Sequence, residues 1–243
     1  MVTRTFSCIM FHALSDSPND KFTLSYHEFD SLIEHLNACK YIVTDINTLS
    51  EKKYPKGKFT VFTFDDGHVS NLYAAKRLHT LGMKATFFLV EEYIGMPEYL
   101  NIEQIKEIVA LGHSIGIHGY DHEWWTDYSV DKLSLKLCEV KEYLTEQLGV
   151  KVISCSPPGG QINEKIIKAI LNLKSFKFVR TSKPGINNEN NKVMFSTGIR
   201  HGSSLDLIMR KISCDKKTYL YLRVLYHIKS ILHRVYWKIT FYR

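Results

Sequence analysis

Residues 59–67, Phe59-Thr60-Val61-Phe62-Thr63-Phe64-Asp65-Asp66-Gly67, decide the fold prediction for this chain. The first six are aromatic or β-branched, which predicts a buried strand over Phe59–Phe64. The Asp-Asp-Gly that follows is typical of a turn, and an isolated one is more often solvated than functional. Here it leaves a buried strand, where two adjacent carboxylates repel each other and lose solvation. Either one is protonated or a cation neutralises them.

Outward from this strand, apolar runs alternate about seven times with segments of helical periodicity. The other predicted strands are Phe6–Phe11, Tyr41–Thr44, Ala85–Val90, Ser114–His118, Val152–Cys155, Phe176–Thr181 and Val193–Ile199. The predicted helices are Ser25–Asn37, Val69–Leu81, Ile102–Leu111, Val130–Leu148, Ile162–Leu173 and Leu205–Ile212. This order predicts a parallel sheet covered by helices, either a barrel or an open doubly wound sheet. The Asn-rich segment Lys183–Lys192 is predicted to be a surface loop.

Polar residues follow several of the predicted strands at their carboxyl ends. Asp65-Asp66 ends one strand and His118 another, while residues 156–160 and Arg200-His201 follow two more. A barrel brings the carboxyl ends of its strands to one face, where it carries its chemistry. We therefore predict an α/β fold, a distorted (β/α) barrel of about seven parallel strands, formed by residues 1–215.

The segment His118-Gly119-Tyr120-Asp121-His122 supplies a candidate cation site. Two imidazoles four residues apart, with one carboxylate, form a two-His, one-Asp site that leaves positions open for water. Eleven histidines also produce such spacings by chance, so the pair alone is weak evidence. Its position on the predicted barrel face that carries Asp65-Asp66 favours a metal site.

These motifs together resemble the polysaccharide deacetylase family, carbohydrate esterase family 4. Thr63-Phe64-Asp65-Asp66-Gly67 is similar to the family's first motif, and His118 with His122 is similar to its H-x-x-x-H motif. The segments 85–88 and 111–116 also look like the family, and the likeness runs from about residue 6 to about residue 202. The resemblance implies a distorted barrel, a divalent metal and N-deacetylation of sugars.

Carried over by the resemblance, Asp65 is the general base and Asp66, His118 and His122 are the metal ligands. The ion would activate water and polarise the acetamide, while the base takes the proton of the attacking water. The metal, and a backbone N–H near Gly159, would hold the oxyanion. Zinc is the expected cofactor, with cobalt, nickel or iron as alternatives, because this ligand set accepts each of them.

Two positions depart from the family pattern. Ser156 stands where many relatives carry an arginine that pairs with the base, and Arg180 or Arg200 is a candidate replacement. The family's motif for the general acid is also unclear. We predict His201 as the acid because it follows the last strand, although an ordinary loop histidine is the alternative. We set His227 aside, since it falls in a predicted terminal helix.

Four residues are predicted to contact the substrate. Trp124 and Trp125 follow His122 and could stack on sugar rings, with packing in the core as the alternative. Pro158 and Gly159 keep the backbone of the family's third motif and would form a wall of the site. His113 precedes its strand, so a structural role is expected for it.

The net charge of +7 lies in the last 28 residues. Residues 216–243 contain seven Lys or Arg and no Asp or Glu, whereas residues 1–215 are balanced, so nucleic acid is not expected as a partner. An apolar stripe with helical spacing comprises Leu220, Val224, Ile228, Ile231, Val235, Ile239 and Tyr242. A basic amphipathic helix over residues 216–243 suits peripheral contact with an anionic membrane. Packing on the barrel or on a second subunit is the alternative.

The expected function is metal-dependent hydrolysis of N-acetyl groups from amino sugars in a glycan or a lipid-linked glycan intermediate. A non-catalytic glycan-binding or membrane-associated protein and a sugar deformylase are the alternatives. The first residues read as a strand and not as a signal peptide, and five scattered cysteines suit a reducing compartment. We therefore expect a cytoplasmic protein, with peripheral association to the inner membrane.

Overall fold

The structure is a computed structural model that describes residues 4–51 and 54–241, with side chains as far as Ser230. Its strands are β1 (Thr5–Phe11), β2 (Leu14–Ser15), β3 (Leu24–Ser25), β4 (Ile42–Thr44), β5 (Phe59–Phe64), β6 (Thr86–Leu89), β7 (Ser114–Ile117), β8 (Ser154–Cys155), β9 (Phe178–Thr181), β10 (Asn187–Asn188), β11 (Val193–Phe195) and β12 (Thr197–Gly198). Its α-helices are α1 (Tyr26–Ala38), α2 (Ile46–Ser50), α3 (Asn71–Thr80), α4 (Ile102–Ala110), α5 (Val130–Leu148), α6 (Glu164–Asn172), α7 (Leu205–Ile212) and α8 (Lys216–Phe241).

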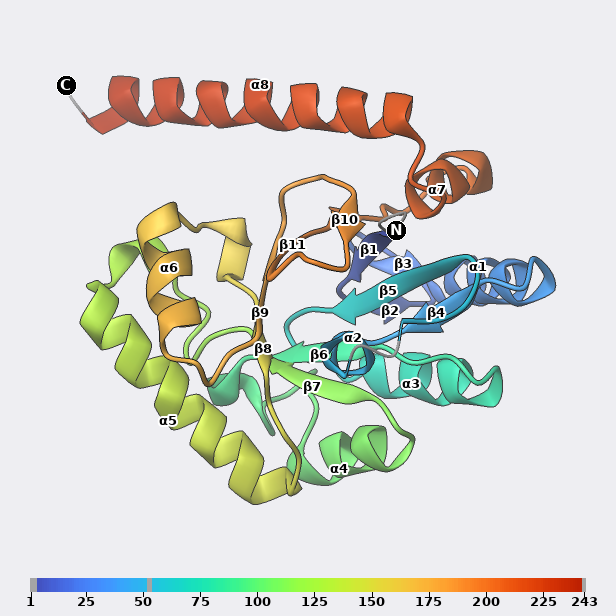
Figure 1. Cartoon of the computed structure of the whole chain (residues 1–243), viewed down its shortest axis with the longest axis horizontal. Coiled ribbons are helices and arrows are strands. Elements are labelled where there is room, and N and C mark those ends of the chain that lie inside the picture. The colour runs from blue at the N-terminus through green and yellow to red at the C-terminus, as the bar shows by residue number, and fades with distance from the viewer. Residues whose placement is uncertain (1–3, 52–53, 242–243) are drawn as a thin grey trace.

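The central sheet confirms the predicted barrel. Within the described residues, seven strands pair side by side in parallel, in the order β1-β5-β6-β7-β8-β9-β11. The short strand β12 follows β11 directly and pairs in parallel with β1, which closes the sheet on itself. Helices surround these strands (Figure 1). The result is a distorted, incompletely regular (β/α) barrel.

Side-chain alternation along the strands divides the apolar residues between two clusters. On β5, Phe62 and Phe64 point to the helices, and Phe64 stacks on Phe87 of β6 with ring centroids 4.8 Å apart. Phe59 and Val61 point the other way, into a smaller cluster in the barrel interior. Because successive strand residues face opposite sides, Asp65 continues the interior face.

The sequence prediction was wrong at the segment Lys183–Lys192, which is not simply a surface loop. It contains β10, which pairs antiparallel with the start of β1. Asn187 is fully buried, and its side-chain amide exchanges two hydrogen bonds of 2.8 Å with the backbone of Phe195. Here an asparagine side chain makes the hydrogen bonds that the backbone of a neighbouring strand would otherwise make. The segment therefore lacks the apolar periodicity by which a strand is predicted. The predicted strand Val193–Ile199 is likewise split into β11 and β12.

Helix α8 begins at Lys216, where the basic segment begins, and runs across one side of the molecule (Figure 1). Thr218 and Tyr219 are buried, whereas Leu220, Val224 and Ile228 are 66%, 48% and 47% exposed. The start of the predicted stripe therefore faces away from the barrel. Its continuation, Ile231, Val235, Ile239 and Tyr242, lies outside the described side chains. Among the described residues, no helix combines the length and the apolar character needed to cross a bilayer.

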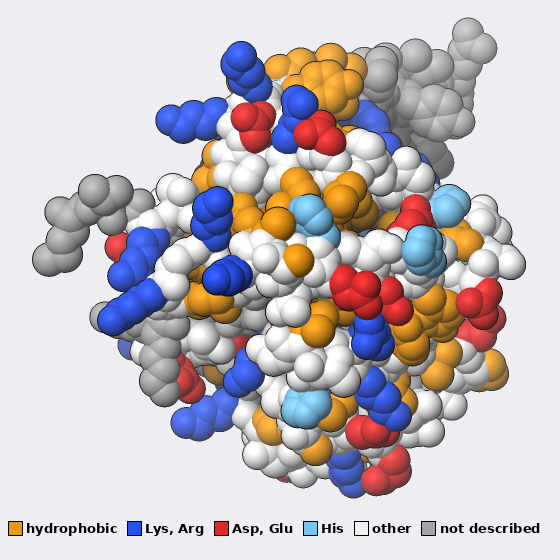
Figure 2. Space-filling view, turned by 90° about the vertical axis from the view of Figure 1, so that its right-hand side faces the viewer, with side chains coloured by type: hydrophobic (Ala, Val, Ile, Leu, Met, Phe, Trp, Pro, Cys, Tyr) orange, Lys and Arg blue, Asp and Glu red, His pale blue; other side chains and the backbone are white. Residues whose placement is uncertain are grey.

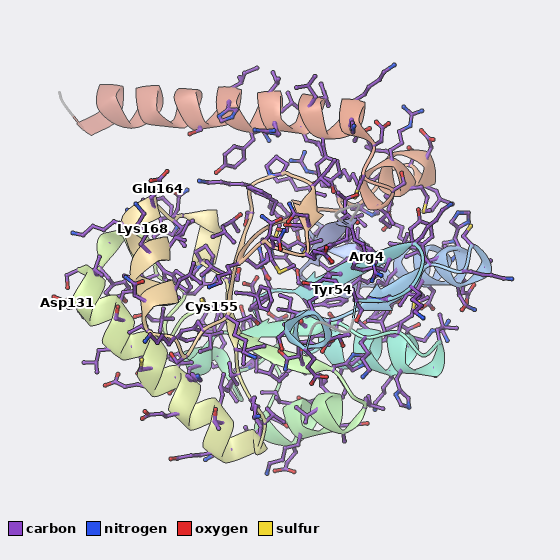
Figure 3. All side chains as sticks on the ribbon, viewed as in Figure 1. Arg4, Tyr54, Asp131, Cys155, Glu164 and Lys168 are labelled. Carbon is purple, nitrogen blue, oxygen red and sulfur yellow. The ribbon has the colours of Figure 1, made fainter. Side chains whose placement is uncertain are left out.

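One face of the molecule carries side chains of both charges. On the face shown in Figure 2, Lys and Arg side chains are interspersed with Asp and Glu. Asp131 of α5 and Glu164 and Lys168 of α6 project from the outer helices, while Cys155 lies inside on β8 (Figure 3). All five cysteines are free.

Candidate metal centre

The candidate residues stand at neighbouring strand ends on one rim of the barrel. Asp65 follows β5 and its N–H donates to the carbonyl of Phe11 at 2.9 Å. His118 follows β7 and donates to Leu89, and Ser156 follows β8 and donates to Ile117. Each of these bonds extends a parallel ladder by one residue. Strand pairing therefore fixes the positions of these residues before any side-chain interaction is considered.

Asp66, His118 and His122 converge on one point. The Nε2 atoms of both histidines lie 3.2 Å from Oδ1 of Asp66, and the three potential ligand atoms lie within 4.8 Å of one another. His118 is 3% exposed, and the side chains of Asp66 and His122 are 27% and 35% exposed. The cluster is thus buried on one side and open on the other, as a catalytic metal site requires.

The hydrogen bonds of the cluster leave its three potential ligand atoms available to a cation. Nδ1 of His118 lies 2.9 Å from the carbonyl of Ser156, to which it donates, and this bond directs Nε2 at Asp66. Oδ1 of Asp66 is buried, and no well-directed donor reaches it from the described residues. Once the imidazoles have lost their Nε2 protons, a metal ion would stabilise the nitrogen lone pairs that face Oδ1 of Asp66. This set of one carboxylate and two imidazoles fits zinc.

Backbone geometry brings two of the three ligands into place. Asp66 and His122 have φ values of +72° and +59°, a left-handed conformation that non-glycine residues seldom adopt. Gly67 follows with φ +76°, and a Cβ on it would lie 3.0 Å from the side chain of Leu89. Such conformations cost free energy and persist where the surrounding structure enforces them. Gly67 therefore allows the turn that aims Asp66 at the histidines.

The protonation of the metal-free cluster reflects the same contacts. Burial alone raises the pKa of Asp66, but the two nearby imidazoles outweigh this effect and hold its pKa well below the ordinary value. The contact with Asp66 in turn raises the pKa of His122, against the opposing effect of burial. His122 therefore keeps a proton at a higher pH than an ordinary histidine, and a metal ion must displace that proton.

Asp65 is held separately, by an arginine. Its Oδ1 accepts a short hydrogen bond from Nη2 of Arg180, and both side chains are almost completely buried. Oδ2 of Asp65 lies 3.9 Å from Nε2 of His118, beside the metal cluster. Of the two arginines considered from sequence, Arg180 is thus the partner of Asp65, while Arg200 is exposed. The cation that pairs with Asp65 therefore comes from β9 and not from the segment that contains Ser156.

The segment after β8 forms one wall of the site. Pro158 is buried, and Gly159 adopts φ +58° with the indole Nε1 of Trp124 only 2.9 Å from where its Cβ would lie. Trp124 is 36% exposed and remains a candidate sugar platform. The stacking role is wrong for Trp125, which is 1% exposed and packs in the main core, because a buried indole presents no face to a ligand.

The remaining histidine predictions have different outcomes. His201 is 45% exposed at its side chain, and its Nδ1 lies 2.8 Å from Oε2 of Glu28. It follows β12, but the described contacts do not join it to the metal cluster. His113 is structural as expected, since its ring is buried and bonds the backbone of Ala75 and Ala85.

Three residues near the metal cluster escaped the sequence analysis. The ring of Tyr93 stacks on the ring of His122, with centroids 5.8 Å apart. The ring centroids of Tyr93 and Tyr99 are 4.5 Å apart. His12, directly after β1, lies close enough for its charge to contribute to the low pKa of Asp66. The tyrosines lie outside every motif. The position of His12 at a strand end was the signal that could have identified it.

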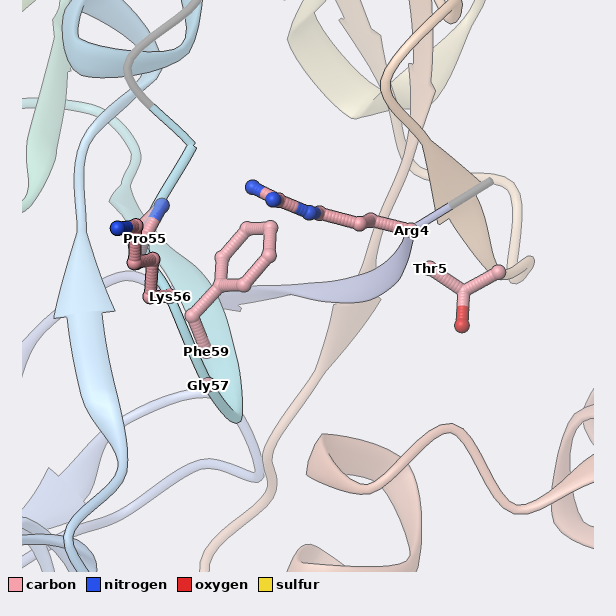
Figure 4. Close-up of a pocket in the computed structure, with 6 residues that line it drawn as sticks. All are labelled: Arg4, Thr5, Pro55, Lys56, Gly57 and Phe59. Carbon is pink, nitrogen blue, oxygen red and sulfur yellow. The ribbon is translucent and has the colours of Figure 1, made fainter. Parts of the chain in front are cut away.

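A separate cavity of about 340 Å³ lies at the amino ends of β1 and β5 (Figure 4). Arg4, Pro55, Lys56 and Phe59 are among its lining residues. It is at the opposite end of these strands from Asp65, so it is not part of the candidate metal centre.

Comparison with known proteins agrees with this geometry. Residues 52–176, just over half of the chain, match the sequence profile of the polysaccharide deacetylase family, and the chain belongs to that family. It is 27% identical over 182 residues to YxkH of Bacillus subtilis (strain 168), a protein assigned to the polysaccharide deacetylases, covering 73% of the chain and 64% of YxkH. It is 26% identical over 134 residues to the peptidoglycan-N-acetylglucosamine deacetylase PgdA of Listeria monocytogenes serotype 1/2a, covering 54% of the chain and 28% of PgdA. The chain thus spans only part of these relatives.

Solved structures show the same fold. The Streptococcus pyogenes deacetylase PplD, in complex with acetate, superposes with a TM-score of 0.78 at 21% identity over 87% of this chain and 99% of PplD. IcaB from Ammonifex degensii superposes with a TM-score of 0.72 at 20% identity over 90% of this chain and 97% of IcaB. The barrel is therefore that of a known group of deacetylases.

Zinc binding is expected to release protons in a pH-dependent way. Because the pKa of His122 is raised in the metal-free protein, zinc must displace its proton below that pKa, and affinity must fall as the pH falls. Calorimetry in buffers of different ionisation enthalpy should show that the number of protons displaced from His122 per zinc falls as the pH rises through the raised pKa of that imidazole. His79→Ala, remote from the site, should behave as the wild type. Proton release independent of pH would contradict the assignment of His122.

Loss of Arg180 is expected to destabilise the fold through Asp65. Arg180→Met leaves a buried carboxylate unpaired and should lower the free energy of unfolding by ~3–5 kcal/mol. Asp65→Asn combined with Arg180→Met should cost less than the sum of the two single variants, as measured by urea unfolding. Arg77→Met, which breaks a more exposed pair with Asp30, should cost ~1 kcal/mol or less. Additive losses for Asp65 and Arg180 would show that the pair is not coupled.

Proposed function

We propose that this protein is a metal-dependent carbohydrate N-deacetylase, which hydrolyses the N-acetyl group of an amino sugar and releases acetate. One observation carries the proposal: the Asp65–Arg180 pair lies beside the Asp66, His118 and His122 cluster on the same rim of the barrel. Family membership supports the same chemistry. PgdA is a peptidoglycan-N-acetylglucosamine deacetylase by name, which supports an N-acetylated amino sugar as the substrate.

In the proposed reaction, Asp65 and Gly159 have separate roles beside the metal. A bound divalent ion would polarise the acetamide carbonyl and make water more acidic. Asp65 is fixed by Arg180 through one oxygen, which leaves Oδ2 on the side of the metal cluster to take a proton from the attacking water. Gly159 in the neighbouring wall is exposed, and its backbone N–H is the proposed donor to the developing negative charge.

His201 is the proposed general acid for the departing amine. Its Nδ1 faces the carboxylate of Glu28, which leaves Nε2 to donate a proton, an arrangement by which carboxylates orient catalytic imidazoles. Glu28 is kept ionised for this role. Burial raises its pKa, but hydrogen bonds from the N–H groups of Ser25 and Gly202, together with His201, lower it to about 2.

The alternatives predict different behaviour of the same site. A non-catalytic glycan-binding barrel has no use for a buried carboxyl group paired with an arginine beside a metal cluster, so the intact Asp65–Arg180 pair argues against it. Deformylation would use the same residues, so only the acyl group of the substrate separates it from deacetylation.

Replacement of the two neighbouring carboxylates is expected to have different effects. Asp65→Asn should retain stoichiometric zinc but lower kcat for acetate release by ~10²–10⁴-fold, because only the base is lost. Asp66→Ala should lose zinc itself. Zinc is measured by atomic absorption and acetate by an enzyme-coupled assay on N-acetyl and N-formyl oligosaccharides. Zinc-loaded wild type that releases neither acetate nor formate would reject the enzyme proposal, and formate alone would favour deformylation.

The His201–Glu28 pair is expected to act in one step. His201→Ala should lower kcat by ~10²-fold or more with little change in KM, and Glu28→Gln should lower it less. Addition of imidazole should restore part of the activity of His201→Ala. His227→Ala, at the histidine that was set aside, serves as the matched control. Wild-type kcat in His201→Ala would transfer the role of acid to another residue.

We further propose that the substrate is lipid-linked and that the enzyme works at the cytoplasmic face of the inner membrane. The support is the exposed apolar start of the α8 stripe, Leu220, Val224 and Ile228, on a helix whose charged side chains are all basic. Such a helix suits an anionic bilayer surface. A second copy of the chain is the competing occupant of this stripe.

Membrane contact through α8 is expected to depend on this stripe. Full-length protein should float with liposomes that contain phosphatidylglycerol, and Leu220→Ser with Val224→Ser and Ile228→Ser should reduce the floated fraction several-fold. Leu135→Ser on α5, where the side chain is 60% exposed, is the control for a surface leucine. Equal flotation of all forms would end the proposal, and a change in oligomeric state alone would favour packing between copies.

A further inference from the structure

A cavity of about 440 Å³ lies where α7 and α8 meet the seam of the barrel. Its floor includes Met10 of β1, Gly198 of β12 and Ser182, which follows β9, and its roof includes Tyr221 and Leu225 of α8. It belongs neither to the metal cluster nor to the cavity at the amino ends of the strands. It therefore requires its own explanation.

The charged residues of this cavity are all basic. Arg200, Lys211 and Lys229 line it, and its lining contains no aspartate or glutamate. None of the three forms an ion pair with a carboxylate in the part of the chain that the structure describes. Three cations around one cavity create a positive potential that the protein itself does not neutralise.

Lys211 is the most informative of the three. Its side chain is buried, with the residue 5% exposed, and Nζ donates to the carbonyl of Gly198 at 2.9 Å. Burial, together with the nearby charge of Arg200, lowers its pKa to about 8. Burial of a cation without a counter-charge costs free energy. Buried, perturbed groups of this kind cluster at functional sites, where a ligand can supply the opposite charge.

The cavity lies next to the catalytic base. Met10, Ser182 and Ser196 line it, and the same three side chains contact Nη1 of Arg180 at 3.0, 3.4 and 3.5 Å. The other terminal nitrogen of Arg180 binds Asp65. The arginine thus separates the cavity from the reaction site by the width of one guanidinium group.

We propose that Arg200, Lys211 and Lys229 bind the phosphate or diphosphate group of an amphiphilic substrate whose amino sugar reaches the metal cluster. This inference rests on the proposed function and specifies its substrate class. Phosphate oxygens accept charge-assisted hydrogen bonds from Arg and Lys, and the hydroxyl groups of Ser203 and Tyr221 line the same cavity.

The rest of the cavity suits the carrier of such a phosphate. Leu207, Leu222 and Leu225 provide apolar lining beside the cations. Val224 and Ile228 continue an apolar surface along the outside of α8. A phosphate attached to an apolar chain matches this combination, whereas a neutral oligosaccharide leaves the three cations without a partner.

The test compares three substrates in the zinc-loaded, full-length enzyme: a short-chain polyprenyl-diphosphate-linked N-acetylglucosamine, N-acetylglucosamine 1-phosphate and an uncharged N-acetylglucosamine oligomer. Lys211→Met and Arg200→Gln should each raise KM for the polyprenyl-diphosphate substrate about 10-fold or more, because each removes a charge-assisted contact. KM for the neutral oligomer and kcat should stay unchanged. Lys217→Met and Arg210→Gln, outside the cavity, are the matched controls.

Binding of polyprenyl diphosphate without a sugar, measured by calorimetry, separates this inference from the proposed function. If no substrate is deacetylated but this diphosphate binds wild type and not Lys211→Met, the phosphate site stands and the proposed activity falls. If every substrate is deacetylated and its KM is the same in the two variants as in wild type, the phosphate site is overturned and the activity stands.

Binding of phosphatidylglycerol vesicles that depends on Lys211, without binding of the diphosphate, would assign the cavity to a membrane headgroup and overturn the substrate assignment. Arg200→Gln, at an exposed position, decides the result if Lys211→Met does not fold.

Discussion

Two adjacent carboxylates at the end of a buried strand impose the constraint on which the rest of the site depends. Asp65 and Asp66 would repel each other strongly if a low-dielectric barrel rim held them without compensation. The fold separates their partners: Asp65 faces the interior and pairs with Arg180, whereas Asp66 turns through a left-handed conformation toward His118 and His122. One carboxylate is thus compensated by a fixed cation of the protein, and the other by a site suited to a metal. This division gives neighbouring residues different chemical roles.

The barrel makes this division possible because its strands alternate side chains between interior and helix-facing layers. Phe62 and Phe64 anchor β5 among the helices, while Val61 and Asp65 lie on the interior face with the buried guanidinium of Arg180. The arginine approaches from β9, 115 residues further along the chain. A change in strand register by one residue would exchange these faces and separate the base from its partner.

Arg180 also connects Asp65 to a second charged region of the protein. Its guanidinium contacts Asp65 on one side and the lining of a basic cavity on the other. Helices α7 and α8 cover that cavity and contribute Lys211 and Lys229 to it. The basic C-terminal segment, which looks in sequence like a separate tail, therefore lines a cavity next to the rim that carries Asp65 and the candidate metal cluster. This arrangement is the basis for proposing an amphiphilic, phosphate-bearing substrate and contact with a membrane surface.

The sequence by itself determined the barrel, the three residues of the candidate metal cluster and the start of the basic helix. These features depend on local signals: apolar periodicity, short motif spacing and a run of positive charge. Only the tertiary structure decided that Arg180 and not Arg200 replaces the arginine missing at Ser156, that Trp125 is core while Trp124 is exposed, and that Lys211 is buried beside Arg200. The reason is that such partnerships join residues far apart in the chain, through strand register and the closure of the barrel. No local pattern records which distant side chain fills a given position in the interior.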